Sequence, residues 1–86
     1  MRLSIDLRGT PARYFGKLDK PTQKRIKEKL IELSEEPFSA KHSKPLHGVD
    51  KRTARIGKYR ILFQVIDNNT LRVVDIGPRG DIYKDL

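Results

Sequence analysis

The chain has 86 residues, which is enough for one domain with a modest core, and we treat residues 1–86 as a single domain. It contains no cysteine, so disulfides, thiolate metal sites and a thiol nucleophile are excluded. The formal net charge of +8 attracts polyanions such as nucleic acids, although surplus lysine for solubility is an alternative explanation of that charge.

The N-terminal segment is expected to be a strand. Leu3, Ile5 and Leu7 alternate with polar or charged residues, which is the period of two of a strand with one buried face. A signal peptide or a membrane span would instead show a continuous apolar run. We therefore expect a soluble, cytoplasmic protein without a membrane partner.

Two helices are expected next, and together they form a helical hairpin. Thr10 followed by Pro11 is a capping and first-turn pair, which predicts a short amphipathic helix. Asp19 is expected to cap a second helix from Pro21 to Glu35, which ends before Pro37. Apolar residues at helical spacing form the stripe of this helix: Ile26, Leu30 and Leu33.

The second half of the chain is expected to hold an exposed loop and three strands. Polar and turn-forming residues predict the loop from Phe38 to Asp50. Tight turns then join strands at Thr53 to Ile56, Tyr59 to Ile66 and Leu71 to Ile76, and the middle strand is apolar enough for the centre of a sheet. Gly77-Pro78 is expected to break the ladder before a short tail.

This order of elements predicts an α+β fold. It consists of an N-terminal strand, an α-helical hairpin, and three antiparallel strands that form a small twisted sheet with the helices packed on one face.

Positive charge is concentrated in one segment of the chain. Between Lys41 and Arg60 the only acid is Asp50, whereas the bases are Lys41, Lys44, Lys51, Arg52, Arg55, Lys58 and Arg60. Strand pairing would gather several of these bases, with Arg79, into a patch that binds phosphate and stabilises a pentacovalent phosphorane. The alternative is that several are solvated edge residues. Arg60 begins a strand that is expected to be buried, and burying a charge is costly unless the charge has a partner or a function.

Few other side chains suggest chemistry. Tyr83 can stack on an RNA base or exchange a proton, or it can anchor the tail on the sheet. His47 is a general acid or base by side-chain type alone, and a loop histidine without a partner is usually inert. His42 and His47 lack the second pair of ligands that zinc needs, and a nucleotide-binding glycine loop is missing. We therefore expect no metal and no cofactor.

The motifs of the C-terminal half are similar to those of a known family. KPLHGVDKRTARIGKYRILFQVI, followed by VVDIGPRGDIYKDL, resembles the RelE/ParE toxin pattern of a leucine-glycine loop, an arginine strand, a G-x-Y-R strand and a C-terminal arginine with a nearby tyrosine. The strand-helix-helix beginning fits as well, so the resemblance covers nearly the whole chain. It implies a RelE-like fold and a toxin of a type II toxin-antitoxin pair, neutralised by a small RelB-like antitoxin.

The resemblance also implies an activity. RelE-type toxins enter the ribosomal A site and cut the mRNA there, so we expect a metal-independent RNA endonuclease (an mRNA interferase) that inhibits translation, with the ribosome, mRNA and ribosomal RNA as partners. Cleavage would resemble attack of a ribose 2′-hydroxyl on the adjacent phosphate, leaving a cyclic phosphate and a 5′-hydroxyl. Motif positions assign as catalytic residues Arg55, Arg60, Arg79 and Tyr83. Neighbouring bases are expected to bind RNA: Lys44, Lys51, Arg52 and Lys58.

Two positions depart from the family pattern. A second base often found in the arginine strand would fall near Thr53, where Arg52 or Lys51 is the candidate substitute, and Pro78 stands where many relatives have histidine. Two alternative functions therefore remain. One is a ParE-like protein that inhibits DNA gyrase without being a nuclease. The other is an inactive, basic RNA-binding relative.

Overall fold

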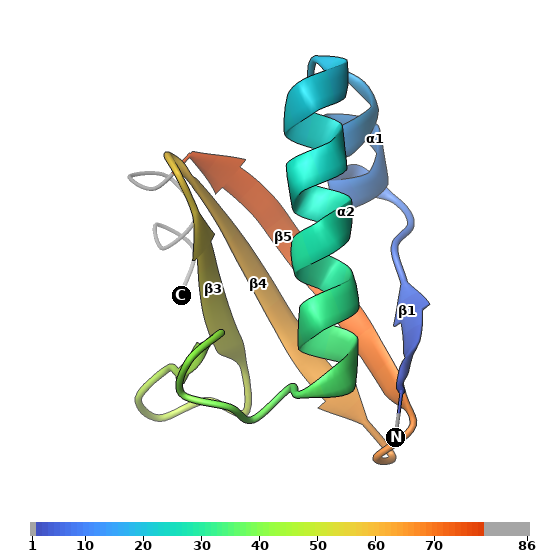
Figure 1. Cartoon of the computed structure of the whole chain (residues 1–86). Helices are drawn as coiled ribbons and strands as arrows, with labels where there is room; N and C mark the ends of the chain where they lie inside the picture. The colour runs from blue at the N-terminus through green and yellow to red at the C-terminus, as the bar shows by residue number, and fades with distance from the viewer. Residues whose placement is uncertain (1, 79–86) are drawn as a thin grey trace.

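The computed structural model describes residues 2–78 and shows two helices beside one sheet. In chain order the elements are β1 (Ser4–Asp6), α1 (Thr10–Gly16), α2 (Lys20–Glu35), β2 (Lys44–Pro45), β3 (Arg52–Ile56), β4 (Tyr59–Ile66) and β5 (Thr70–Pro78). The strand order is β1-β5-β4-β3-β2, with β1 parallel to β5 and the other neighbours antiparallel. Figure 1 shows α2 crossing one face of this sheet. The predicted α+β class is confirmed, with β4 at the centre.

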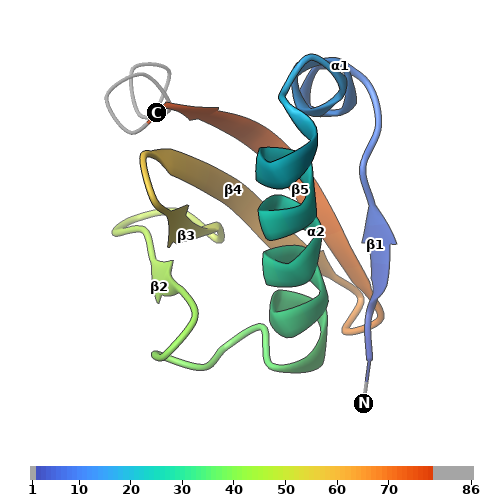
Figure 2. The ribbon, with the colours of Figure 1, turned by 45° about the horizontal axis from the view of Figure 1, so that its top comes forward.

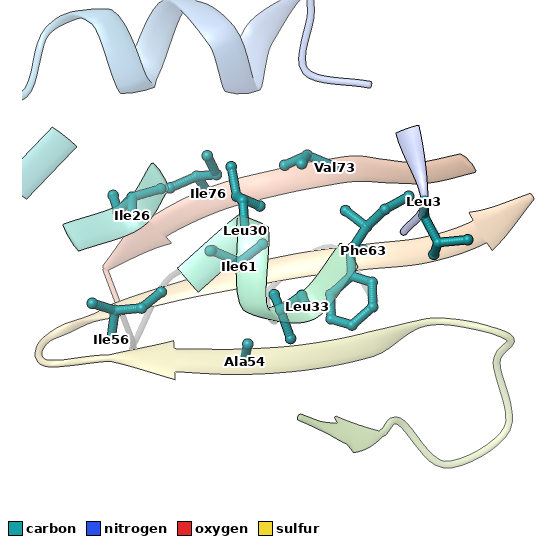
Figure 3. Packing of buried hydrophobic residues seen from close by; sticks show 11 residues of the cluster. Leu3, Ile26, Leu30, Leu33, Ala54, Ile56, Ile61, Phe63, Val73 and Ile76 are labelled. Carbon is teal, nitrogen blue, oxygen red and sulfur yellow. The ribbon is translucent and has the colours of Figure 1, made fainter. Parts of the chain in front are cut away.

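The core lies between α2 and the sheet, as Figure 3 shows. The predicted stripe of α2 is buried there: Ile26, Leu30 and Leu33. From β4, Ile61 and Phe63 join the same cluster, and both are fully buried. Burial of each such side chain stabilises the fold by about 1.5–3 kcal/mol. No helix within residues 2–78 has the length and apolar character needed to cross a membrane.

A bulge in β5 lets residues with irregular spacing share the core. Phe63 pairs with Val73 and Leu62 pairs with Asp75, so Val74 is an extra residue in β5. Because of this extra residue, Val73 and Ile76 both reach the core cluster although they are three positions apart. Strict alternation would have placed one of them on the opposite face.

The two helices begin in different ways. Asp19 caps α2 as predicted: its carboxylate accepts hydrogen bonds from the Thr22 hydroxyl at 2.6 Å and the Thr22 backbone N–H at 3.4 Å. The bond from the hydroxyl is the main cause that holds the pKa of Asp19 below its ordinary value. The predicted cap at Thr10 is wrong, because Gly9 is the capping residue of α1. The Thr10 hydroxyl instead accepts a bond from Arg13 at 3.1 Å.

Two boundaries differ from the prediction. The segment predicted as a loop from Phe38 to Asp50 contains β2, whose two residues pair with β3, and two residues are too few to show a period in the sequence. The predicted break at Gly77-Pro78 is also wrong, since both residues pair with β4. Pro78 is tolerated because, within the described residues, β1 accompanies β5 only as far as Arg72.

The tight turns use residues suited to left-handed backbone. Asp67 and Asn68, in the predicted turn between β4 and β5, have φ of 53° and 59°. Gly57 in the turn between β3 and β4 has φ of 56°. A Cβ atom at Gly57 would also lie 2.9 Å from Nη2 of Arg25 on α2. This turn therefore requires glycine for its backbone, whereas the flexible end of the Arg25 side chain can move away from a new methyl group.

Replacing Gly57 with alanine is expected to lower the free energy of unfolding by about 1–2 kcal/mol, mostly through left-handed strain. The matched control is Gly16→Ala at the end of α1. There φ is not left-handed and no atom lies within 4 Å of the new methyl group, so stability should hold or rise. Urea denaturation measures both variants. Equal stability of the two variants would contradict the left-handed conformation assigned to Gly57.

Candidate nucleic-acid interface

The centre of the candidate site is a pair of arginines that face each other across two strands. Arg55 of β3 and Arg60 of β4 are direct partners in the antiparallel register. Two like charges in this position repel each other and destabilise a sheet. A ligand with negative charge removes that repulsion, so the pair is suited to binding an anion.

The strand pattern directs both arginines away from the core. Their neighbours in the strands, Ala54, Ile56 and Ile61, belong to the buried cluster beneath α2. Since successive side chains of a strand point to opposite faces, Arg55 and Arg60 project from the other face. Arg55 is exposed and Arg60 is half-buried.

Both arginines line a cavity of about 410 Å³ at the β3 edge of the sheet. Its other titratable lining residues come from α2, from the segment before β2, and from β2 itself: Lys29, Lys41, His42 and Lys44. We call it the basic cavity, because no aspartate or glutamate of residues 2–78 lines it. Figure 2 shows the segment after α2 leading to β2 and β3.

Lys44 stands beside the position where the family pattern has a second base. It is the register partner of Thr53, which is 2% exposed and lines the same cavity. Lys44 thus brings a positive charge from β2 next to the uncharged residue of β3. The pairing of the two-residue β2 produces this arrangement.

The two substitutes proposed for Thr53, Arg52 and Lys51, lie elsewhere. Arg52 donates two hydrogen bonds to Ser43, from Nε to Oγ at 2.8 Å and from Nη2 to the carbonyl oxygen at 3.2 Å. Its guanidinium also lies 5.6 Å from the ring centroid of Phe38. Lys51 is 3.9 Å from a carboxylate oxygen of Asp50.

Arg52 and Lys51 line a second cavity of about 400 Å³ together with the exposed Phe38 and Val49. Neither base lines the basic cavity. Arg52 anchors the segment that carries Ser43, and its role in RNA binding stays a prediction, as does that of Lys51.

The remaining predicted residues fall in three places. Lys58 lies in the turn between β3 and β4, with its Nζ 5.7 Å from the ring centroid of Tyr59. Lys58 does not line the basic cavity. Arg79 and Tyr83 lie outside the described residues, so their assignments stay predictions.

Three titratable residues of the basic cavity were not among the predicted site residues: Lys29, Lys41 and His42. Lys29 reads as one more polar residue of an amphipathic helix, and His42 as one more residue of a polar loop. Tertiary packing brings them to the arginine pair, and nothing in the local sequence signals it. His47, the histidine considered as an acid or base, is exposed and lines neither cavity.

The arrangement favours phosphate chemistry on an extended substrate. Guanidinium groups match phosphate oxygens two at a time, and lysines add attraction at longer range. The volume of the cavity is in the range of pockets that bind small molecules, so it is large enough for a single nucleotide and too small for a nucleic-acid duplex.

Comparison with known proteins gives a family and a fold. Residues 6–83 match the family model described as the ParE toxin of type II toxin-antitoxin systems. A search of curated proteins finds no significant match.

Solved structures of toxins share the architecture. One is the RelBE2 toxin-antitoxin complex of Mycobacterium tuberculosis, with 25% identity, a TM-score of 0.78, and coverage of 92% of this chain and 100% of the other. The isolated E. coli RelE toxin has 25% identity, a TM-score of 0.76, and coverage of 96% and 93%. The RelE-RelB complex of Pyrococcus horikoshii, with 23% identity, a TM-score of 0.75, and coverage of 94% and 99%, supports the fold alone.

Proposed function

The chain belongs to the ParE toxin family of type II toxin-antitoxin systems, within the RelE/ParE superfamily, and on this premise we propose that it is a ribosome-dependent mRNA endonuclease. Its protein partner is a RelB-like antitoxin, because the similar structures at 25% identity include toxin-antitoxin complexes. Its other partners are the ribosome, mRNA and ribosomal RNA.

The observation that carries the proposal is the facing pair of Arg55 and Arg60 in the basic cavity. Placed on a scissile phosphate, the two guanidinium groups neutralise the charge that grows on its oxygens as the phosphorane forms. Lys44, beside Thr53, adds a further positive charge to the same cavity. The repulsion between the paired arginines gives a structural reason why an anionic ligand is favoured there.

The proposed reaction is the one that the resemblance to RelE-type toxins implies. The 2′-hydroxyl attacks the adjacent phosphorus, a cyclic phosphate forms, and the bond to the 5′ oxygen breaks. Arg79 would stabilise the leaving oxygen, and Tyr83 would stack on a base or accept the 2′ proton. Arginine is a poor proton donor and tyrosine a poor base at neutral pH. The ribosome compensates by holding the substrate in line, a contribution worth several kcal/mol.

Two other functions have an observation in their favour. The matched family model is that of ParE toxins, which favours inhibition of DNA gyrase by a protein that is not a nuclease. Thr53 and Pro78 favour an inactive, basic RNA-binding protein, because both depart from the pattern that the resemblance implies.

Inducing the protein in cells and mapping the 5′ ends of mRNA tests the proposal. We expect cuts at in-frame codon positions of translated messages, with 5′-hydroxyl ends. The control is the same message with its start codon removed, which should stay intact because no ribosome translates it. Intact mRNA together with DNA damage would identify a gyrase inhibitor, and neither effect would identify an inactive relative.

A further inference from the structure

His42 lines the same cavity as the two arginines, although no sequence motif assigns it a catalytic role. The ring of His42 is mostly buried, with a side-chain exposure of 19%. Its Nδ1 atom lies 4.0 Å from a carboxylate oxygen of Glu32 on α2. His42 belongs to the segment before β2, and its imidazole lies close to α2 at the wall of the basic cavity.

Among residues 2–78, the only titratable side chain of the cavity lining that accepts a proton at neutral pH is that of His42. The other titratable lining groups are lysines and arginines, which are charged at neutral pH and accept no proton: Lys29, Lys41, Lys44, Arg55 and Arg60. Imidazole is the side chain that exchanges a proton most readily near neutral pH. His42 is therefore suited to the proton transfer that arginine and tyrosine perform poorly.

We propose that His42 is the general base of the cleavage reaction, an inference that rests on the proposed endonuclease function. The Glu32 carboxylate lies 4.0 Å from Nδ1, which is beyond hydrogen-bond distance, and its negative charge favours a proton on Nδ1 over one on Nε2. In that tautomer Nε2 is the acceptor. Glu32 is then a positioning residue.

The proposed step is balanced as follows. Nε2 of His42 takes the proton of the 2′-hydroxyl while the 2′ oxygen forms its bond to phosphorus. The bond between phosphorus and the 5′ oxygen breaks, and the leaving oxygen takes a proton from solvent water. The imidazolium returns its proton to the hydroxide so formed.

The charged groups near His42 come from several elements that line the cavity. Glu32 and Lys29 approach from α2, Lys41 from the adjoining segment, Lys44 from β2, and the two arginines from β3 and β4. Only the neutral imidazole accepts a proton. The cleavage rate should therefore fall on acidification, and the fall should follow the uptake of a single proton. His47 is the matched control for His42, because it is exposed and lines neither cavity.

The test measures single-turnover cleavage of mRNA on programmed ribosomes as a function of pH, for the full chain and for His42→Gln and His47→Gln. We expect His42→Gln to lose about 100-fold or more in rate at neutral pH and to lose the acidic fall of the profile. His47→Gln should keep both. Free imidazole should restore part of the rate of His42→Ala, whose truncated side chain leaves room for it.

The outcomes separate this inference from the proposed function. If the wild-type protein does not cleave, both are wrong. If it cleaves and His42→Gln keeps the wild-type rate, the endonuclease stands and His42 is not its base. If His42→Gln loses rate but keeps the wild-type pH profile, and imidazole does not rescue His42→Ala, then His42 is a structural residue and not the general base. If His42→Gln fails to fold, His42→Asn is measured in its place. Independently of any variant, a wild-type cleavage rate that does not fall on acidification would overturn the inference.

Discussion

Replacing Arg60 with alanine is expected to lower cleavage on programmed ribosomes by about two orders of magnitude while ribosome binding persists. The reason is that an arginine on the scissile phosphate interacts most strongly in the transition state, where the charge is greatest. Arg60→Lys should restore only part of the rate, because a point charge does not reproduce the two-pronged guanidinium contact. Cleavage and ribosome binding are measured in parallel, and circular dichroism checks the fold.

The matched controls are lysines of α2 that are exposed and do not line the basic cavity, Lys24 and Lys27. Their replacement with alanine should reduce nonspecific RNA binding slightly and leave cleavage nearly intact. If these variants lose as much activity as Arg60→Ala, bulk charge explains the activity and the assignment of the site must be abandoned.

Replacing Phe63 with alanine is expected to cost about 3–5 kcal/mol of unfolding free energy. Phe63 is fully buried at the centre of β4, and its removal opens a cavity beneath α2 (Figure 3). A domain of this size is stable by roughly 4–13 kcal/mol, so the loss is a large share of the total. Thermal denaturation should show a midpoint lowered by more than about 10 °C.

Phe38 supplies the comparison for Phe63, because its side chain has the same size and is 63% exposed. Its contact with Arg52 is worth about 1 kcal/mol or less, so Phe38→Ala should unfold close to the wild-type midpoint. A similar loss of stability in both variants would show that the assignment of the core is wrong.

Local patterns were enough to predict most of the fold. The alternation of apolar and polar residues predicted β4, because a strand has a side-chain period of two. The apolar stripe predicted α2, because its spacing has the period of a helix. Asp19 was identifiable as a cap because a short acidic side chain before a helix bonds the first backbone amides. The errors at β2 and Pro78 have another origin, because both segments depend on pairing with another strand. At Thr10 the error was one position, since the helix is capped by the preceding Gly9.

The candidate site was predictable only in part. Arg55 and Arg60 could be named because they stand at motif positions of the family that the sequence resembles, and the structure shows that they are partners across β3 and β4. Arg52 could not be placed, because its guanidinium bonds to Ser43, nine residues earlier. Lys29 and His42 reach the cavity from other elements, and no pattern along the chain connects them with the arginines.

The parallel pairing of β1 with β5 has a consequence for how the chain folds during synthesis. Arg72 donates a bond to Asp6 at 3.2 Å across 66 residues, whereas β3, β4 and β5 are joined by short turns. Contacts between distant residues carry a larger entropy of loop closure, so the three-stranded meander can form before the N-terminal strand docks. Since β5 is the strand that joins β1 to the meander, the sheet is completed only after β5 has left the ribosome that makes the chain.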